Sequence, residues 1–205
     1  MGNLQVGTCG WQQLEGQDFY PEDMPVEWRL DFYSNAFRVV LVPESEWMAW
    51  ESVDVEACID GVEGEFEFYL RLDDEVTAAN ESQISYLKQR LGDLLKGLVV
   101  FSESILPATK IASLPVSLVS SALQLPGWVS SICGHFVSGN PIGYCETLPT
   151  DGKKQAGLLK DFMQTHPQNA NNSHNSDALA FFIGGDSINM TQVSNLKVVG
   201  EFLGY

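Results

Sequence analysis

The residues best suited to chemistry follow three segments that have the pattern of buried strands. Trp11 and Tyr20 follow the first segment, Arg71 lies near the end of another, and Asp186 follows the last. In a parallel α/β fold the loops after the strands converge on one face, where functional side chains gather. Arg71 would anchor a carboxylate or phosphate there, while Trp11 and Tyr20 would wall a cleft. The alternative is that Arg71 pairs with Asp186 or another local carboxylate and only neutralises charge.

A second candidate is the turn before the last predicted helix, Gly184-Gly185-Asp186-Ser187. Backbone N–H groups at a helix N-terminus bind phosphate well, so Gly184, Gly185 and Ser187 could form an anion cradle. A glycine pair alone is weak support for such a site. The simpler interpretation is an ordinary strand-to-helix turn that is capped by Ser187 or Asn189.

The four cysteines, Cys9, Cys58, Cys133 and Cys145, are too few and too scattered for a disulfide framework, and we expect them to be reduced. Cys9 would need a lowered pKa and a nearby base to act as a nucleophile, so a small buried thiol is the simpler interpretation. Cys133, His135 and Cys145 are possible zinc ligands, but their spacing fits no standard finger. We therefore expect neither a metal nor another cofactor.

Composition limits the class of protein. The chain has 205 residues, 44% of them hydrophobic, which suits one domain over 1–205. A net charge of −16 and a pI near 4.3 repel phosphate backbones and anionic lipid, so nucleic acid and membranes are poor partners. The sequence contains neither a long apolar span nor the pattern of a signal peptide, which predicts a cytoplasmic protein.

Apolar periodicity predicts that strands alternate with helices. Strands are expected at 4–8, 37–42, 65–72, 98–101 and 178–183, and helices at 25–37, 44–60, from 80 onward, 152–165 and 190–203. Within 102–150, the least regular stretch, Pro115 indicates a helix over 115–124, and 128–133 and 142–147 have the pattern of strands. The alternation favours a parallel α/β sheet, either open and doubly wound or closed into a barrel.

The opening of the chain resembles a known family. The run Gly7-Thr8-Cys9-Gly10-Trp11 is followed by Phe19-Tyr20-Pro21, then Met24-Pro25 and Leu30-Asp31-Phe32-Tyr33. In order and spacing this is similar to the YecE-like family, labelled domain of unknown function 72. The resemblance implies a TIM-type barrel and no securely established activity. Since such barrels typically need about 250 residues, we expect a barrel trimmed to about seven strands, with the loss inside 102–150.

The resemblance weakens at the strand ends. Where the family's second strand ends with a glutamate and an asparagine, this chain has Leu41 and Pro43, although Arg71 and Asp186 are kept. This favours a divergent relative that acts as a non-catalytic interaction or structural protein. The alternative is a protein that binds, or an enzyme that converts, a small and possibly phosphorylated molecule at the carboxyl-end face. The expected partner is accordingly a small anionic molecule or another protein.

Overall fold

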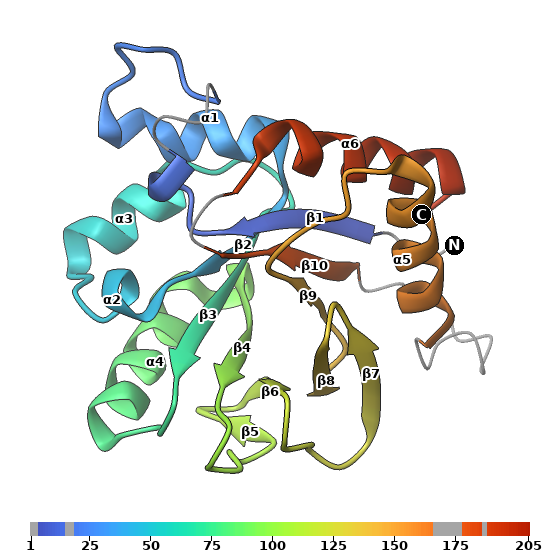
Figure 1. Cartoon of the computed structure of the whole chain (residues 1–205). Coiled ribbons are helices and arrows are strands. Elements are labelled where there is room, and N and C mark those ends of the chain that lie inside the picture. Colours follow the sequence, from blue (N-terminus) through green and yellow to red (C-terminus); the bar gives the residue numbers. More distant parts are fainter. Residues whose placement is uncertain (1–3, 15–18, 166–177, 186–187) are drawn as a thin grey trace.

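The structure is a computed structural model that describes residues 4–14, 19–165, 178–185 and 188–205 (Figure 1). The strands are β1 (Leu4–Cys9), β2 (Val39–Val42), β3 (Glu67–Asp73), β4 (Leu95–Phe101), β5 (Lys110–Ile111), β6 (Leu114–Ser120), β7 (Trp128–Ile132), β8 (His135–Gly139), β9 (Gly143–Cys145) and β10 (Leu179–Ile183). The helices are α1 (Arg29–Ala36), α2 (Glu44–Trp47), α3 (Ser52–Asp60), α4 (Ala78–Leu91), α5 (Gly152–Thr165) and α6 (Met190–Leu203). None of these helices is long and apolar enough to cross a membrane.

One sheet organises the molecule. Nine strands follow the order β7-β8-β6-β4-β3-β2-β1-β10-β9 and form a nearly closed barrel, while β5 pairs with β6 off this path. The strands from β6 to β9 in that order are parallel, whereas β8 and β7 run antiparallel to their neighbours. The predicted barrel-like α/β fold with a mostly parallel sheet is confirmed. Seven strands make up its parallel part, but the sheet as a whole is larger than expected.

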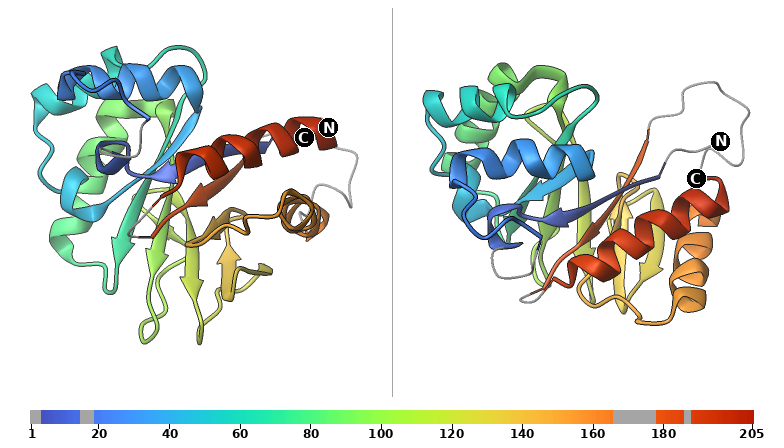
Figure 2. Two further views of the ribbon diagram at one scale, coloured as in Figure 1. Left: turned by 45° about the horizontal axis from the view of Figure 1, so that its top comes forward. Right: turned by 90° about the horizontal axis from the view of Figure 1, so that it is seen from above.

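The strand β3 shows how the two sides of the sheet differ, because successive side chains of a strand point to opposite faces. Phe68 packs against Trp50 of the outer layer, with ring centres 6.4 Å apart. Tyr69 points the other way and meets Phe182 of β10 across the barrel, at 5.2 Å. Arg71 lies two residues after Tyr69 and therefore faces the barrel interior. Figures 1 and 2 show the helices outside the sheet.

The first two strands approach one another closely at Gly7. A Cβ atom at this position would collide with the backbone carbonyl of Val39 on β2, so only glycine fits. Next to it, the hydroxyl of Tyr33 from α1 accepts a hydrogen bond from the backbone N–H of Thr8, at 2.9 Å, and donates one to the carbonyl of Val39, at 3.0 Å. These contacts tie α1 to both strands.

The predicted helix over 115–124 is wrong, because residues 115–120 belong to the strand β6 and residues 121–124 form neither a helix nor a strand. Short apolar runs do not distinguish a buried strand from a buried helix, and Pro115 is also tolerated at the beginning of a strand. The buried hydroxyl of Ser117 is satisfied there by the carbonyl of Asn140, at 2.8 Å. The strands expected near 128–133 and 142–147 are present as β7 and β9, whereas β8 was not predicted. The helix expected over 44–60 is divided into α2 and α3.

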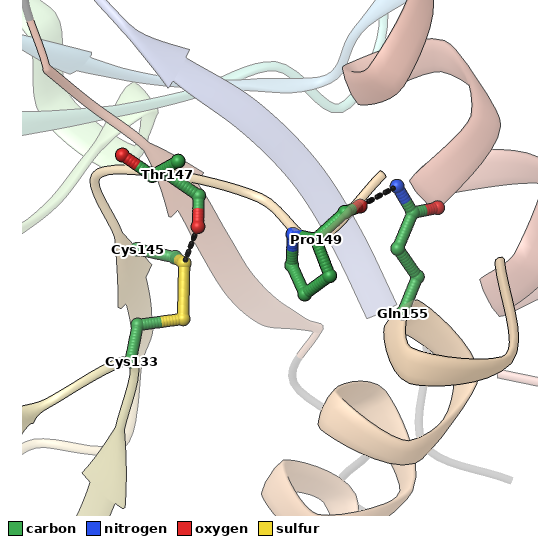
Figure 3. Close-up of a disulfide and its surroundings, with 5 residues drawn as sticks. All are labelled: Cys133, Cys145, Thr147, Pro149 and Gln155. Atoms are coloured by element: carbon green, nitrogen blue, oxygen red, sulfur yellow. Dashed lines mark hydrogen bonds between the residues drawn. A yellow bond between two sulfur atoms is a disulfide. The ribbon is translucent and has the colours of Figure 1, made fainter. Parts of the chain in front are cut away.

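The expectation of four reduced cysteines is also wrong. Cys133 and Cys145 form a disulfide, with Cα atoms 5.4 Å apart (Figure 3). Their spacing in sequence gave no sign of it, because the bond depends on the barrel bringing the end of β7 beside the end of β9. Cys9 and Cys58 are free and buried.

Candidate functional site

A cleft of about 470 Å³ opens at the carboxyl ends of the strands. Its wall comes from the ends of five parallel strands or from the residues just after them. The lining residues are Cys9, Pro43, Glu44, Ser45, Arg71, Asp73, Tyr144, Glu146 and Gly185. This is the face on which parallel barrels gather functional side chains.

Arg71 is the cation in the cleft lining, and several contacts fix it. Its Nε donates a hydrogen bond to Oδ1 of Asp73, at 2.8 Å, and Nη1 lies 3.8 Å from the Sγ of Cys9. The guanidinium stacks over the ring of Phe101, 4.3 Å from its centre. Trp47 donates its indole N–H to the Arg71 carbonyl, at 2.7 Å, which holds the backbone in place. The charged group is thus held in one orientation, with its side chain still 28% exposed.

Three carboxylates line the cleft together with this arginine. Asp73 forms the ion pair just described, while Glu44 accepts two hydrogen bonds from neutral donors, the backbone N–H of Asp73 and the side-chain amide of Asn80, both at 2.8 Å. Glu146 follows β9 and is exposed at the rim. With Asp73 neutralising Arg71, Glu44 and Glu146 leave the cleft acidic. Such a wall accepts hydrogen bonds from amines and hydroxyls, and it favours a negative charge only directly beside the Arg71 guanidinium.

Cys9 is present in the cleft as a neutral thiol. Burial raises the pKa of Cys9, and the nearby Arg71 guanidinium offsets this effect only in part. Because the thiolate is the nucleophilic form, a buried cysteine with a raised pKa is poorly activated. The structure therefore agrees with the simpler interpretation of Cys9 as a buried thiol at a strand end.

Tyr144 on β9 places a buried hydroxyl at the cleft. The residue is 1% exposed, and its ring packs edge-on against Phe101, at 4.8 Å. Burial raises the pKa of Tyr144, with only partial relief from Arg71, so the phenol stays protonated and can donate a hydrogen bond. Since Tyr144 lines the cleft, this hydroxyl is placed to contact a bound molecule.

The structure brings together some of the residues singled out in the sequence. Arg71 and Gly185 both line the cleft. Gly184 lies beside them, and its N–H donates to the carbonyl of Cys145, at 3.0 Å, so this donor is already used. Asp186 and Ser187 lie outside the described residues. For Arg71, the predicted pairing with a local carboxylate is realised by Asp73.

Trp11 and Tyr20 lie elsewhere. Trp11 is 4% exposed and packs against Trp50 and Phe68 in the layer between sheet and helices. Tyr20 donates its hydroxyl to the carbonyl of Trp11, at 2.7 Å, and packs against Phe32. Neither residue lines the described cleft. A glycine-rich strand end followed by aromatics can thus mark a packing layer as well as a site.

Sequence reasoning missed Glu44, Asp73, Tyr144 and Glu146 as members of the cleft. Glu44 lies within an acidic stretch that resembles a solvated surface, although its position directly after Pro43 and the second strand was a usable signal. Tyr144 and Glu146 belong to the irregular region, where no register could be assigned.

For metal binding, the described residues include no group of three or more His, Cys, Asp or Glu side chains suited to hold an ion.

The fold and the cleft define an α/β barrel-type protein with an acidic polar site at its strand ends. A family profile described as "Protein of unknown function DUF72" matches residues 5–131, and the chain belongs to this family. The crystal structure of a DUF72 family protein from Thermotoga maritima matches with a TM-score of 0.55 and 12% identity, over 99% of this chain and 100% of that one. At this identity the match supports the fold alone. A search of curated proteins gave no match.

Proposed function

We propose that this DUF72 protein binds a small polar molecule in the strand-end cleft, with Arg71 as the anchor for a carboxylate of the ligand. The observation that carries the proposal is a single arginine, fixed in orientation and partly exposed, on the wall of a polar cleft of about 470 Å³. Arginine binds carboxylates through two parallel N–H donors, and Nη2 makes no hydrogen bond within the described chain. A polar cleft supports ligand binding over a purely structural role, for which apolar filling is expected.

The charge of the wall narrows the chemistry of the ligand. Glu44 and Glu146 favour a molecule whose other groups are hydrogen-bond donors, namely amines or hydroxyls. A phosphate dianion is disfavoured, because it would face these carboxylates with only Arg71 in compensation. The ligand class is therefore a carboxylic acid that also bears amine or hydroxyl groups. The neutral thiol of Cys9 supports binding without covalent turnover.

The test is a thermal-shift screen of amino acids and hydroxy acids, each paired with its uncharged amide, followed by calorimetry on any acid that binds. We expect binding by acids and not by their amides. Arg71→Ala should weaken binding by about 10- to 100-fold, the usual effect of losing a hydrogen bond to a charged group, and Arg71→Lys should weaken it less. If the acid and its amide bind with equal affinity, or if the wild type and Arg71→Ala bind the acid equally well, Arg71 does not bind the carboxylate of the ligand.

A further inference from the structure

The barrel has a seam between β7 and β9. These strands stand at the two ends of the sheet order, so in the described structure no ladder of hydrogen bonds joins them. β7 pairs only with β8, and the three residues of β9 pair only with β10. The disulfide crosses this seam, from Cys133 in the turn after β7 to Cys145 at the end of β9 (Figure 3). A covalent bond thus stands where other neighbouring strands have hydrogen bonds.

The two ends of this disulfide differ in exposure. Cys133 is exposed in the turn between β7 and β8, whereas Cys145 is fully buried. The Sγ of Cys145 also lies 3.2 Å from the carbonyl oxygen of Thr147. A disulfide sulfur carries no proton, so in the oxidised state the Sγ of Cys145 and the Thr147 oxygen are only in van der Waals contact. After reduction, the thiol of Cys145 would find a hydrogen-bond acceptor already in place.

We propose that the Cys133–Cys145 bond is a reversible redox closure of the barrel, and that a dithiol is its reductant. A thiolate of the dithiol attacks the sulfur of Cys133, a residue of the exposed turn, and forms a mixed disulfide with it. The bond to Cys145 breaks at the same time, and Cys145 leaves as a thiolate that takes up a proton. The second thiol of the reductant then displaces Cys133, which takes up another proton. Two electrons pass to the protein, which gains two thiols, while the dithiol becomes a disulfide.

The closure acts on the cleft through its position in the chain. Tyr144 and Glu146, which line the cleft, are the immediate neighbours of Cys145. A second anchor follows, since the side-chain amide of Gln155 on α5 donates to the carbonyl of Pro149, at 2.8 Å (Figure 3). Reduction removes the first anchor and leaves the second, so the segment around Glu146 gains freedom. The effect on a ligand rests on the function proposed above, whereas the closure itself does not.

The experiment compares the oxidised full-length protein with the same protein after dithiothreitol, both under native conditions. After reduction, alkylation with N-ethylmaleimide and peptide mass mapping should show a fast new adduct at the exposed Cys133 and a slower one at Cys145, whose segment is released, while labelling of the buried Cys9 and Cys58 should not change with dithiothreitol. Hydrogen exchange at β7 and β9 should become roughly tenfold faster, as expected for the loss of a local restraint, with β2 and β3 unchanged. Reoxidation should restore the slow exchange.

Two variants sharpen the comparison. In Cys133→Ser, hydrogen exchange at β7 and β9 should match that of the reduced wild type and should not change with dithiothreitol. In Cys58→Ala, dithiothreitol should accelerate the exchange as fully as in the wild type. If Cys133→Ser does not fold, the reduced wild type supplies the same measurement. Four free thiols in the air-oxidised, denatured protein would overturn the proposal, as would reduction without faster exchange at β9. If no carboxylic acid binds in either redox state, the proposed function fails while the exchange result still decides the closure.

Discussion

The first half of the barrel and the segment between β4 and α5 are built differently. Over residues 4–101, parallel strands alternate with helices, and all four residues of β2 are fully buried, with side chains packed on both faces. Between β4 and α5, the described chain forms five strands and no α-helix. There β7 buries alternate residues only, and Val129 and Phe136 remain more than one third exposed.

This difference shows two ways to close a barrel. Where helices cover the sheet, apolar packing on both faces holds the strands together. The segment between β4 and α5 has no α-helix of its own. There, antiparallel hairpins and a covalent bond add to the packing of α5 on β7, where the rings of Trp128 and Phe162 lie 6.3 Å apart. The cleft lies across the boundary, because Arg71 and Glu44 come from the helix-covered half and Tyr144 and Glu146 from the other. Its geometry therefore depends on both kinds of closure.

The largest effect should come from overpacking the helix-covered half. In Gly7→Ala the new methyl group would collide with the backbone of Val39, which cannot move aside as a side chain can. We expect a loss of about 3 kcal/mol in the free energy of unfolding, measured by urea denaturation. The matched control is Gly157→Ala in α5, where no atom lies within 4 Å of the new Cβ. Because alanine favours helix, this control should gain roughly 0.5–1 kcal/mol, and equal losses in both variants would contradict the packing argument.

Removing the disulfide should have the next largest effect, in the helix-free segment. Cys133→Ser combined with Cys145→Ala opens a loop with a sequence separation of 12, which should cost about 3 kcal/mol by the chain-entropy estimate. Urea denaturation of the oxidised wild type, with and without dithiothreitol, gives the comparison. The variant should match the reduced wild type and should not respond to dithiothreitol. A variant as stable as the oxidised protein would show that hairpin pairing alone closes this side.

A smaller, pH-dependent effect is expected from Glu46 on α2. Burial raises the pKa of Glu46 to about 7, and its Oε2 is buried without a hydrogen-bond partner in the described structure. The native state therefore retains a proton that the unfolded state releases above about 4.5, so stability falls as the pH rises from about 4.5 to about 7. After allowance for partial solvent exposure, Glu46→Gln should gain about 1 kcal/mol at pH 8 and little at pH 4.5. Denaturation curves at both pH values test this, and an equal gain at both would contradict it.

Glu103, in the helix-free segment, should show the opposite sign and the smallest effect. Its carboxylate accepts hydrogen bonds from the backbone and side chain of Ser121, from the side chain of Ser120 and from the N–H of Ala122, and these bonds lower the pKa of Glu103. A lowered pKa contributes stability above the ordinary value, and this contribution is lost as the pH falls through the native one. Glu103→Gln should therefore reduce stability at pH 7 and leave it unchanged in strong acid. Thermal melts of the wild type and of Glu103→Gln at pH 7 and in strong acid, at about pH 2, measure this difference in stability.

The sequence predicts the helix-covered half far better than the other. The helix at 190–203 matches α6, and the apolar run before Pro43 is β2, because amphipathic stripes and buried runs are local signals. Over 102–150 the strands are short, and their pairing depends on residues distant in sequence. Because this pairing is not visible locally, Pro115 indicated a helix where the structure has the strand β6. The disulfide could not be predicted either, since only the closed sheet brings Cys133 and Cys145 together.

For the site, the sequence predicts the face of the barrel and one side chain, Arg71, but not its companions. Aromatic residues after the first strand are as suitable for packing as for binding, and the structure uses Trp11 for packing. Glu44 looked like part of a solvated surface, because nothing local shows that Asn80 holds it at the cleft. Contacts between side chains from different βα units are a property of the closed barrel, and no single segment encodes them.

Asn80 connects the beginning of α4 to the cleft. Its Oδ1 accepts the backbone N–H of Thr77, at 2.9 Å, as part of the helix cap, and its amide nitrogen donates to Glu44, at 2.8 Å. One side chain thus serves two partners that lie far apart in sequence. Substitutions at Thr77 and Glu44 should therefore be non-additive in a double-mutant cycle, although these two residues make no hydrogen bond to each other in the described structure. Asn80→Asp would keep the acceptor of the cap and replace the donor with a second carboxylate facing Glu44, which separates the two roles of this residue.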